Sequence, residues 1–200
     1  MTRRGRLEPL GPAALGERTE QTLAGTADSG ARMEGQGAVR ARKPLNILAT
    51  IAHHPRLLEP FLAWSAALAL QGELSRRASE LLALRAAWNC RSAFEWGHHA
   101  VYARAAGLTD VEIERVAEGA TAPEWSPEDA ALLRAADELH ATQDLSDETW
   151  NRLRARYDEA QLVEIPFVVG QYTMLSMVAK ATGVPVEEGL PALPEGSGRR

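Results

Sequence analysis

The segment from residue 90 to residue 102 carries the densest group of reactive side chains in the chain. Glu95 and His99 are four residues apart, so in a helix their side chains are neighbours on one face. A carboxylate beside an imidazole raises the basicity of the imidazole and fixes its orientation. The pair is therefore a candidate general acid and base for moving a proton on a substrate.

Two more polar residues share that face. At about 100° per residue, Ser92 and Tyr102 fall with the pair within about a quarter of the helix surface. Glu80 lies twelve residues before Ser92 in the preceding predicted helix, and packing of the two segments can bring it alongside. The candidate catalytic residues are Glu95, His99, Glu80 and Tyr102. The alternative is an ordinary Glu–His pair on a solvated helix face.

Cys90 is the only cysteine, which excludes an intrachain disulfide bond. Its place beside Trp88 on an apolar stretch favours a buried, inert thiol. A reactive thiolate needs a nearby cation, and Arg91 is the only one close in sequence. Cys90 is accordingly the candidate redox residue, as an alternative to the acid/base site.

Two residue pairs have the i,i+3 spacing of di-iron carboxylate bundles, namely Glu95 with His98 and Asp137 with His140. Such a site needs two further carboxylates from long partner helices, and the nominal candidates are Glu80 and Glu164. The predicted helices are short for that architecture, and the second pair begins with Asp. We therefore expect neither a metal nor a cofactor.

Helix signals follow one another from Pro44 to Gly183. Helices are predicted at 56–70, 75–90, 92–106, 109–118, 126–141, 146–156 and 158–182, most of them opened by a Ser, Thr or Asp cap. Pro166 lies inside the last helix and predicts a kink or a break there. Because no run alternates with a period of two, we predict no strands and an all-α fold, a compact multi-helix bundle.

The composition of the chain changes near residue 43. Residues 1–43 are predicted to form one short helix, Ala13–Leu23, and a flexible linker, Gly25–Arg42, that has almost no large apolar residue. Residues 44–190 are predicted to form one helical domain, and residues 191–200 a disordered tail. Several helices, such as 165–178, are apolar around more than half of their circumference, which predicts a homo-oligomer.

Charge and hydropathy limit the classes of partner. The formal net charge is −5, which argues against a nucleic-acid-binding protein because such proteins present a concentrated basic face. The first residues are basic but lack the apolar core of a signal peptide. No apolar stretch approaches the roughly 18 residues of a membrane span. We therefore expect a cytoplasmic protein with a small-molecule substrate and no membrane partner.

These motifs together resemble the carboxymuconolactone decarboxylase and alkylhydroperoxidase D superfamily over nearly the whole chain. The matching pieces include Pro44–Ile47, Ala52–Pro55, Arg77–Arg85, Trp88–Cys90, Glu95–His99, Ala105–Thr109, Trp125–Pro127, Leu133–His140 and Val169–Tyr172. Leu10–Pro12 to Leu23 is similar to the leading helix of the superfamily. The resemblance implies the helical bundle typical of alkylhydroperoxidase D and an oligomeric assembly.

The peroxidase branch of this superfamily carries Glu, then Cys-x-x-Cys, then His four residues after the second Cys. Aligned on this chain, the Glu falls on Glu80, the two cysteines on Ser92 and Glu95, and the His on His99. The peroxidase cycle needs one thiolate to attack the peroxide and a second thiol to resolve the sulfenic acid. With Ser and Glu in those places, that two-cysteine cycle cannot run.

The decarboxylase branch uses neither redox cysteines nor a cofactor. Its resemblance implies proton transfer on a small carboxylated or lactone substrate, with Glu95 and His99 as the acid/base pair. The candidate substrate-binding residues are Ser92, Arg85, Arg91 and His98, with either arginine holding a substrate carboxylate. Two alternatives stay open: a peroxidase or redox protein using Cys90, and a non-catalytic oligomeric binding protein with the same fold.

Overall fold

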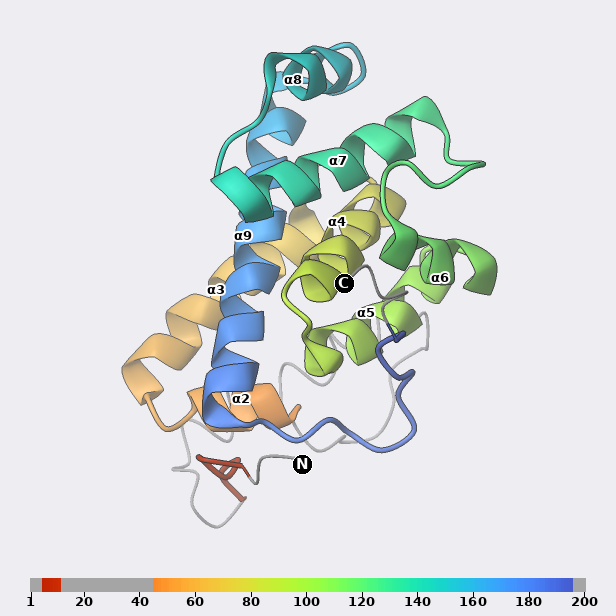
Figure 1. Cartoon of the computed structure of the whole chain (residues 1–200). Coiled ribbons are helices and arrows are strands. Elements are labelled where there is room, and N and C mark those ends of the chain that lie inside the picture. The colour runs from red at the N-terminus through yellow and green to blue at the C-terminus, as the bar shows by residue number, and fades with distance from the viewer. Residues whose placement is uncertain (1–4, 12–44, 196–200) are drawn as a thin grey trace.

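A computed structural model describes residues 5–11 and 45–195. This part of the chain contains eight helices and no strand, which confirms the all-α prediction. The helices are α2 (Asn46–Ile51), α3 (Pro55–Gln71), α4 (Arg76–Asn89), α5 (Ala93–Ala105), α6 (Asp110–Glu118), α7 (Pro127–Thr142), α8 (Asp147–Arg154) and α9 (Glu159–Thr182). The others surround α4 (Figure 1).

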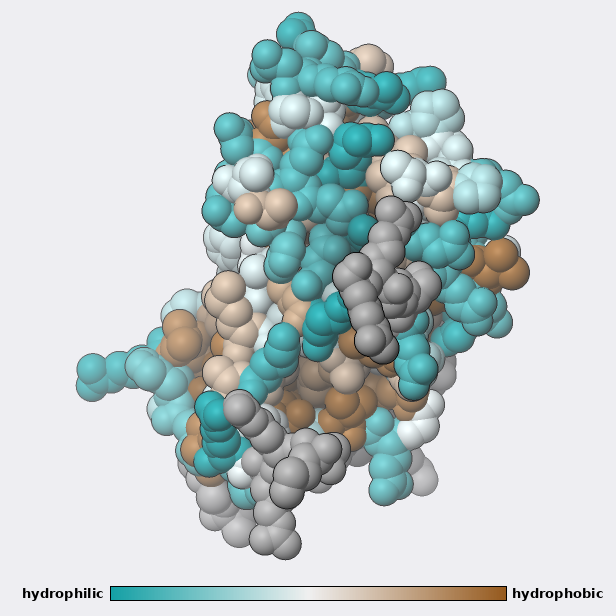
Figure 2. Space-filling model, viewed as in Figure 1, coloured by the Kyte–Doolittle hydropathy of each residue, from teal (hydrophilic) through white to brown (hydrophobic). Residues whose placement is uncertain are grey.

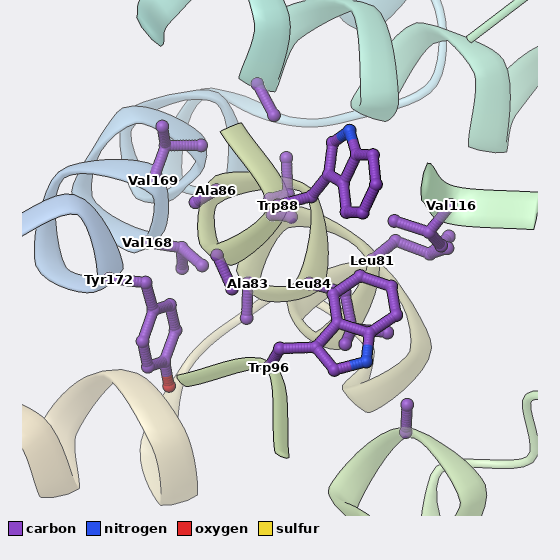
Figure 3. Packing of buried hydrophobic residues seen from close by; sticks show 14 of the residues in the cluster. Leu81, Ala83, Leu84, Ala86, Trp88, Trp96, Val116, Val168, Val169 and Tyr172 are labelled. Atoms are coloured by element: carbon purple, nitrogen blue, oxygen red, sulfur yellow. The ribbon is translucent and has the colours of Figure 1, made fainter. Parts of the chain in front are cut away.

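Helix α4 is the centre of the bundle and packs against α5, α6, α7 and α9. All of its residues from Ala78 to Trp88 are buried except Arg85, which is partly exposed. Small residues on α4 let α9 approach closely, and Figure 3 shows Val168 of α9 beside Ala83 and Ala86 of α4. A helix that is buried over most of its surface needs few polar positions, which explains the apolar stretches Leu81–Leu84 and Ala86–Trp88.

The predicted caps place the helix boundaries. The side chains of Ser75, Ser126 and Ser146 each accept a hydrogen bond from a backbone N–H in the first turn of the helix that follows. Thr109 and Asp158 form complete capping boxes with Glu112 and Gln161. These local rules therefore locate most helix starts to within a residue.

Helix α9 is the longest of the described helices and runs from Glu159 to Thr182 without a break, so of the two predicted outcomes at Pro166, a kink or a break, the break does not occur. It is also long and apolar enough to cross a membrane. Here, however, it packs against α4 and α7 and buries Glu164 and Gln171. The core helix of a soluble protein passes the same test.

Both described ends of the chain are attached to the bundle. The backbone N–H groups of Arg6 and Leu7 donate to the carbonyl of Thr182 over 2.8 and 3.0 Å. Gly183 has a φ of 74°, and a Cβ there would meet the Cα of Gly5 at 3.0 Å, so glycine permits this contact. At the other end Leu193, assigned above to a tail, packs against the core. The predicted helix Ala13–Leu23 and the linker after it lie outside the described residues.

Candidate functional site

His99 and Glu80 form a buried hydrogen-bonded pair between α5 and α4. The Nδ1 of His99 is 2.6 Å from Oε2 of Glu80, and the two side chains are 4 and 1% exposed. The other oxygen of Glu80 accepts a hydrogen bond of 2.9 Å from Arg76. Helix packing therefore does bring Glu80 alongside the imidazole. With both its oxygens accepting, this carboxylate orients the ring through Nδ1.

Glu95 faces the other nitrogen of the same ring. Its Oε2 is 3.7 Å from Nε2 of His99, which is too long for a good hydrogen bond. Its Oε1 is buried and has no hydrogen-bond partner among the described residues. Burial, followed by the negative charge of Glu187, raises the pKa of Glu95 to about 8. Glu95 is therefore a carboxylic acid at neutral pH, with a polar atom left unpartnered.

Two tyrosine rings pack against the imidazole of His99. The ring of Tyr172, from α9, is 4.1 Å away edge-on, and that of Tyr102 is 5.4 Å away. Burial, and then the charges of Glu80 and Glu95, hold the pKa of Tyr172 well above its usual value. Tyr172 is thus a neutral phenol at physiological pH. The rings limit the access of water to His99 and fix its position.

His98 points to a second carboxylate rather than to the Glu80–His99 pair. Its Nε2 is 2.8 Å from Oε2 of Glu187, in the segment that follows α9. The backbone N–H of Asn46 donates to the other oxygen of Glu187 over 2.8 Å. Burial opposes ionisation, but these hydrogen bonds outweigh it and lower the pKa of Glu187. His98 therefore holds the C-terminal segment on α5.

The same segment lies close to α5 at Gly97. A Cβ on Gly97 would come within 3.1 Å of Leu190 and 3.3 Å of the carbonyl of Pro191. The glycine therefore makes room for the chain at this crossing. Through this approach, Glu187 comes near enough to Glu95 for its charge to act on that carboxyl.

Three of the residues predicted to bind substrate have structural partners instead. Arg85 makes two hydrogen bonds to Asp137, of 2.6 and 3.0 Å, and donates to the carbonyls of Val116 and Ala117. The guanidinium of Arg91 stacks on Trp88 at 4.0 Å. Ser92 is fully buried and caps α5. The structure therefore does not bring either arginine to the Glu80–His99 pair, because Arg85 lies on the α6 and α7 side of α4.

Cys90 is partly exposed, so the prediction of a buried thiol is wrong. It follows the last residue of α4, and its Sγ is 3.9 Å from Nδ1 of His140. Its carbonyl accepts a hydrogen bond from Lys180. The thiol therefore contacts the end of α7 and the backbone of Cys90 contacts the end of α9, and no hydrogen bond joins the thiol to the Glu80–His99 pair.

The two i,i+3 pairs considered for a di-metal site do not converge. Asp137 is paired with Arg85, and His140 contacts Cys90 at the surface. Glu164 accepts hydrogen bonds from the backbone N–H groups of Glu73 and Leu74. Within the described ranges, no group of three or more His, Cys, Asp or Glu side chains could hold a metal ion.

Three further residues belong to the site and were not predicted from the sequence: Arg76, Tyr172 and Glu187. Arg76 has a local signal, because it precedes Glu80 by four residues on the same helix. Tyr172 belongs to a stretch that matched the superfamily, but no local rule assigns it a role. Glu187 is 89 residues from His98, and nothing in the sequence around it marks the contact.

The family model of the carboxymuconolactone decarboxylase family matches residues 55–138, the stretch that contains Glu80, Glu95 and His99. No curated protein is significantly similar to the chain in sequence. Solved structures with the same fold are similar at low identity.

The debrominase Bmp8 in complex with 2,3,4-tribromopyrrole has a TM-score of 0.75 and 15% identity over 94% of this chain and 95% of that chain. A peroxidase-related protein from Ralstonia eutropha with an alkylhydroperoxidase AhpD core has a TM-score of 0.76 and 18% identity, covering 92% of this chain and 93% of that one. Another peroxidase-related protein, from Silicibacter sp., has a TM-score of 0.74 and 18% identity, covering 94% and 96%.

Those sequence identities establish the fold alone. The family model covers α4 and α5, the helices that carry Glu80, Glu95 and His99. Residues 55–138 therefore match the carboxymuconolactone decarboxylase family, and the described part of the chain has the fold of the alkylhydroperoxidase AhpD core.

Proposed function

We propose that this protein is a cofactor-independent acid/base enzyme that transfers a proton on a small organic substrate. The observation that carries the proposal is the placement of His99 between two buried carboxyl groups, 2.6 Å from Glu80 and 3.7 Å from Glu95. Acid/base sites typically contain neighbouring titratable groups whose environments shift their pKa values away from one another.

Each member of the cluster has a separate task. Glu80 accepts the Nδ1–H of His99, which leaves the lone pair on Nε2 to act as the general base. Glu95 remains protonated at neutral pH, because its pKa is about 8. Its carboxyl group can donate a hydrogen bond to a substrate carbonyl oxygen while Nε2 takes or returns a proton at the neighbouring carbon. Tyr102 and Tyr172 flank the ring and position it.

The substrate class follows from the charges around the cluster. A carboxylated substrate was expected to bind Arg85 or Arg91, and both guanidinium groups have other partners. Arg76 already donates to Glu80 and to the carbonyl of Ala69. We therefore favour an uncharged lactone or other carbonyl compound, which can accept a hydrogen bond from Glu95, over a carboxylate. We further propose a cytoplasmic location.

Hydrogen–deuterium exchange on the substrate tests this proposal. A panel of lactones, each with and without a carboxyl group, is incubated with the protein in D₂O and followed by proton NMR. We expect the wild type to exchange the proton beside the carbonyl of an uncharged lactone, and His99→Ala to lose exchange while its circular dichroism stays helical. His140→Ala, which lies outside the cluster, is the matched control. Exchange at the wild-type rate in His99→Ala contradicts the proposal.

A thiol peroxidase is the second candidate, because Cys90 is partly exposed and within 3.9 Å of His140. In that reaction the thiolate attacks a peroxide, releases an alcohol or water and becomes a sulfenic acid, which an external thiol reduces. Peroxide consumption with dithiothreitol, compared between wild type, Cys90→Ser and His99→Ala, distinguishes a thiol peroxidase from the acid/base enzyme. Loss of turnover only in Cys90→Ser supports the peroxidase and overturns the acid/base proposal.

A further inference from the structure

The segment that follows α9 crosses α5 without forming a helix or a strand. Residues 185–195 leave the end of α9, pass α2 and turn along α5 (Figure 1). Among the described residues, no backbone–backbone hydrogen bond joins this segment to the rest of the chain. Pro185, Pro191 and Pro194 have no N–H to donate, which disfavours regular structure here. Residues 185–193 are called the C-terminal strap below.

Side-chain hydrogen bonds attach the strap to the bundle, and most of them end on Glu187. The backbone N–H of Asn46, in α2, and the Nε2 of His98, in α5, each lie 2.8 Å from an oxygen of this carboxylate. A further hydrogen bond of 3.0 Å runs from Nδ2 of Asn46 to the carbonyl of Pro185. Within the described part of the chain, Glu187 is therefore the main polar latch of the strap.

The apolar contacts of the strap are few. Leu193 packs against the core, and Leu190 lies over Gly97. Val186 is 40% exposed, and Glu188 is exposed as well. Figure 2 shows hydrophobic residues along the lower part of this face, where the strap crosses it. A segment with so little burial has the low local stability that is typical of lids over active sites.

The strap lies beside the buried cluster. Glu187 is close enough to Glu95 for its charge to act on that carboxyl, and His98, which contacts Glu187, directly precedes His99. Glu95 and His99 are each 3% exposed. A molecule from solution therefore cannot reach Nε2 of His99 until a covering segment moves.

The other segments that contact the cluster have less freedom to move. Glu80 belongs to α4 and Tyr172 to α9, and these two helices pack against each other and against α5. Displacing either helix would disrupt the close-packed core. Among the described segments that give the cluster a partner or a charge, the strap is the one that can move without disturbing helix packing.

We propose that the C-terminal strap opens away from α5 and gives a small organic molecule access to Glu95 and His99. Opening breaks both contacts of Glu187 and lifts Leu190 from Gly97. The chain stays anchored up to Val184, whose N–H donates to the carbonyl of Ala179. The nature of the entering molecule rests on the function proposed above, whereas the opening itself does not.

A disulfide bond that locks the strap tests the proposal. A Cβ on Gly97 would lie 3.1 Å from the Cβ of Leu190. Disulfide bonds join Cβ atoms about 3.5–4.5 Å apart, so a small shift lets Gly97→Cys and Leu190→Cys form one. The pair is made together with Cys90→Ser, which leaves no other thiol. Diethylpyrocarbonate, which modifies accessible imidazoles, is the probe, and peptide mass spectrometry gives the rate at each histidine.

We expect His99 to be modified at least about tenfold more slowly in the oxidised form than in the reduced form. His140, which is exposed on α7, should react equally in both and is the internal control. Equal rates at His99 in the two forms, or no modification of His99 in either, overturn the proposal. The probe needs no turnover, so a protein inactive on lactones leaves this result intact. Lactone exchange that continues in the oxidised form overturns the strap and keeps the acid/base site.

Glu187→Ala tests the latch without an engineered disulfide bond. The substitution removes both hydrogen bonds of the carboxylate and is expected to raise the rate of modification at His99 at least about threefold. Glu188→Ala is the matched control, because Glu188 is adjacent and exposed. A Glu187→Ala protein with wild-type circular dichroism and an unchanged rate at His99 contradicts a strap held by Glu187.

Discussion

His99 and Glu80 are joined by a hydrogen bond of 2.6 Å, although they belong to different helices and lie 19 residues apart. The bond is buried, and Arg76 occupies the second oxygen of Glu80. The imidazole is therefore held by a carboxylate that has little freedom to rotate. In the acid/base reaction that we propose, the Nε2 side of the ring, which faces Glu95, is therefore the reactive side.

Replacing Glu80 by Gln is expected to reduce kcat about 10²- to 10⁴-fold. The amide keeps the shape of the side chain but can donate to Nδ1 as well as accept from it, so Nε2 is no longer kept free as the base. KM is expected to change little, because Glu80 lies on the Nδ1 side of His99, whereas the proposed substrate binds on the Nε2 side. Steady-state kinetics on the lactone identified by NMR measure both parameters, and Glu148→Gln at the surface is the control. An unchanged kcat contradicts the role of Glu80.

The raised pKa of Glu95 predicts how stability depends on pH. An unfolded Glu titrates near 4.5, whereas folded Glu95 titrates at about 8, so between these values the native state holds a proton that the unfolded state has lost. The free energy of unfolding therefore falls as pH rises from about 4.5 to 8, by about 5 kcal/mol at most, and is unaffected by this group above pH 8. Urea denaturation of wild type and Glu95→Gln at pH 5 and pH 8 measures the effect. We expect Glu95→Gln to lose much less stability between the two values, and parallel losses contradict a protonated Glu95.

The charge of Glu187 is expected to set the alkaline limit of activity. Its negative charge adds to burial in raising the pKa of Glu95, so Glu187→Gln lowers that pKa and moves the alkaline limb of the kcat profile to lower pH. Glu187 acts through Glu95 as a positioning residue, and kcat at the optimum should change less than the position of the limb. Glu188→Gln is the matched control, because Glu188 is adjacent and exposed. An alkaline limb at the same pH in Glu187→Gln contradicts this coupling.

Local signals were sufficient to predict most of the fold. Ser75, Thr109, Ser126 and Asp158 cap the helices that they were predicted to open, because capping involves only the backbone of the next three residues. Pro166 was predicted to kink or break the last helix, and the break does not occur. A proline removes one backbone donor, and the packing of α9 against α4 and α7 keeps the helix continuous all the same.

Helix periodicity and the pairing of neighbouring helices predicted only part of the candidate site. Glu95 and His99 share a face because they are one turn apart, and Glu80 follows from the pairing of neighbouring helices. The contact of His98 with Glu187 spans 89 residues and that of Arg85 with Asp137 spans 52. Neither spacing is encoded by a local rule, since such contacts form only when distant helices pack. Arg85 was consequently predicted to bind the substrate, whereas in the structure its hydrogen bonds join α4 to α6 and α7.

Arg85→Ala is therefore expected to act on stability rather than on substrate binding. The substitution leaves Asp137 with only the hydrogen bond from Asn89 and removes the donors to the carbonyls of Val116 and Ala117, which should lower the free energy of unfolding by about 2–4 kcal/mol. Arg91→Ala removes only the exposed contact with Trp88 and should cost less than about 1 kcal/mol. Urea denaturation gives the two stabilities, and KM for the lactone should stay within about twofold of wild type in both folded variants. A large rise in KM without a loss of stability in Arg85→Ala would instead indicate that Arg85 binds the substrate, and would favour a carboxylated substrate.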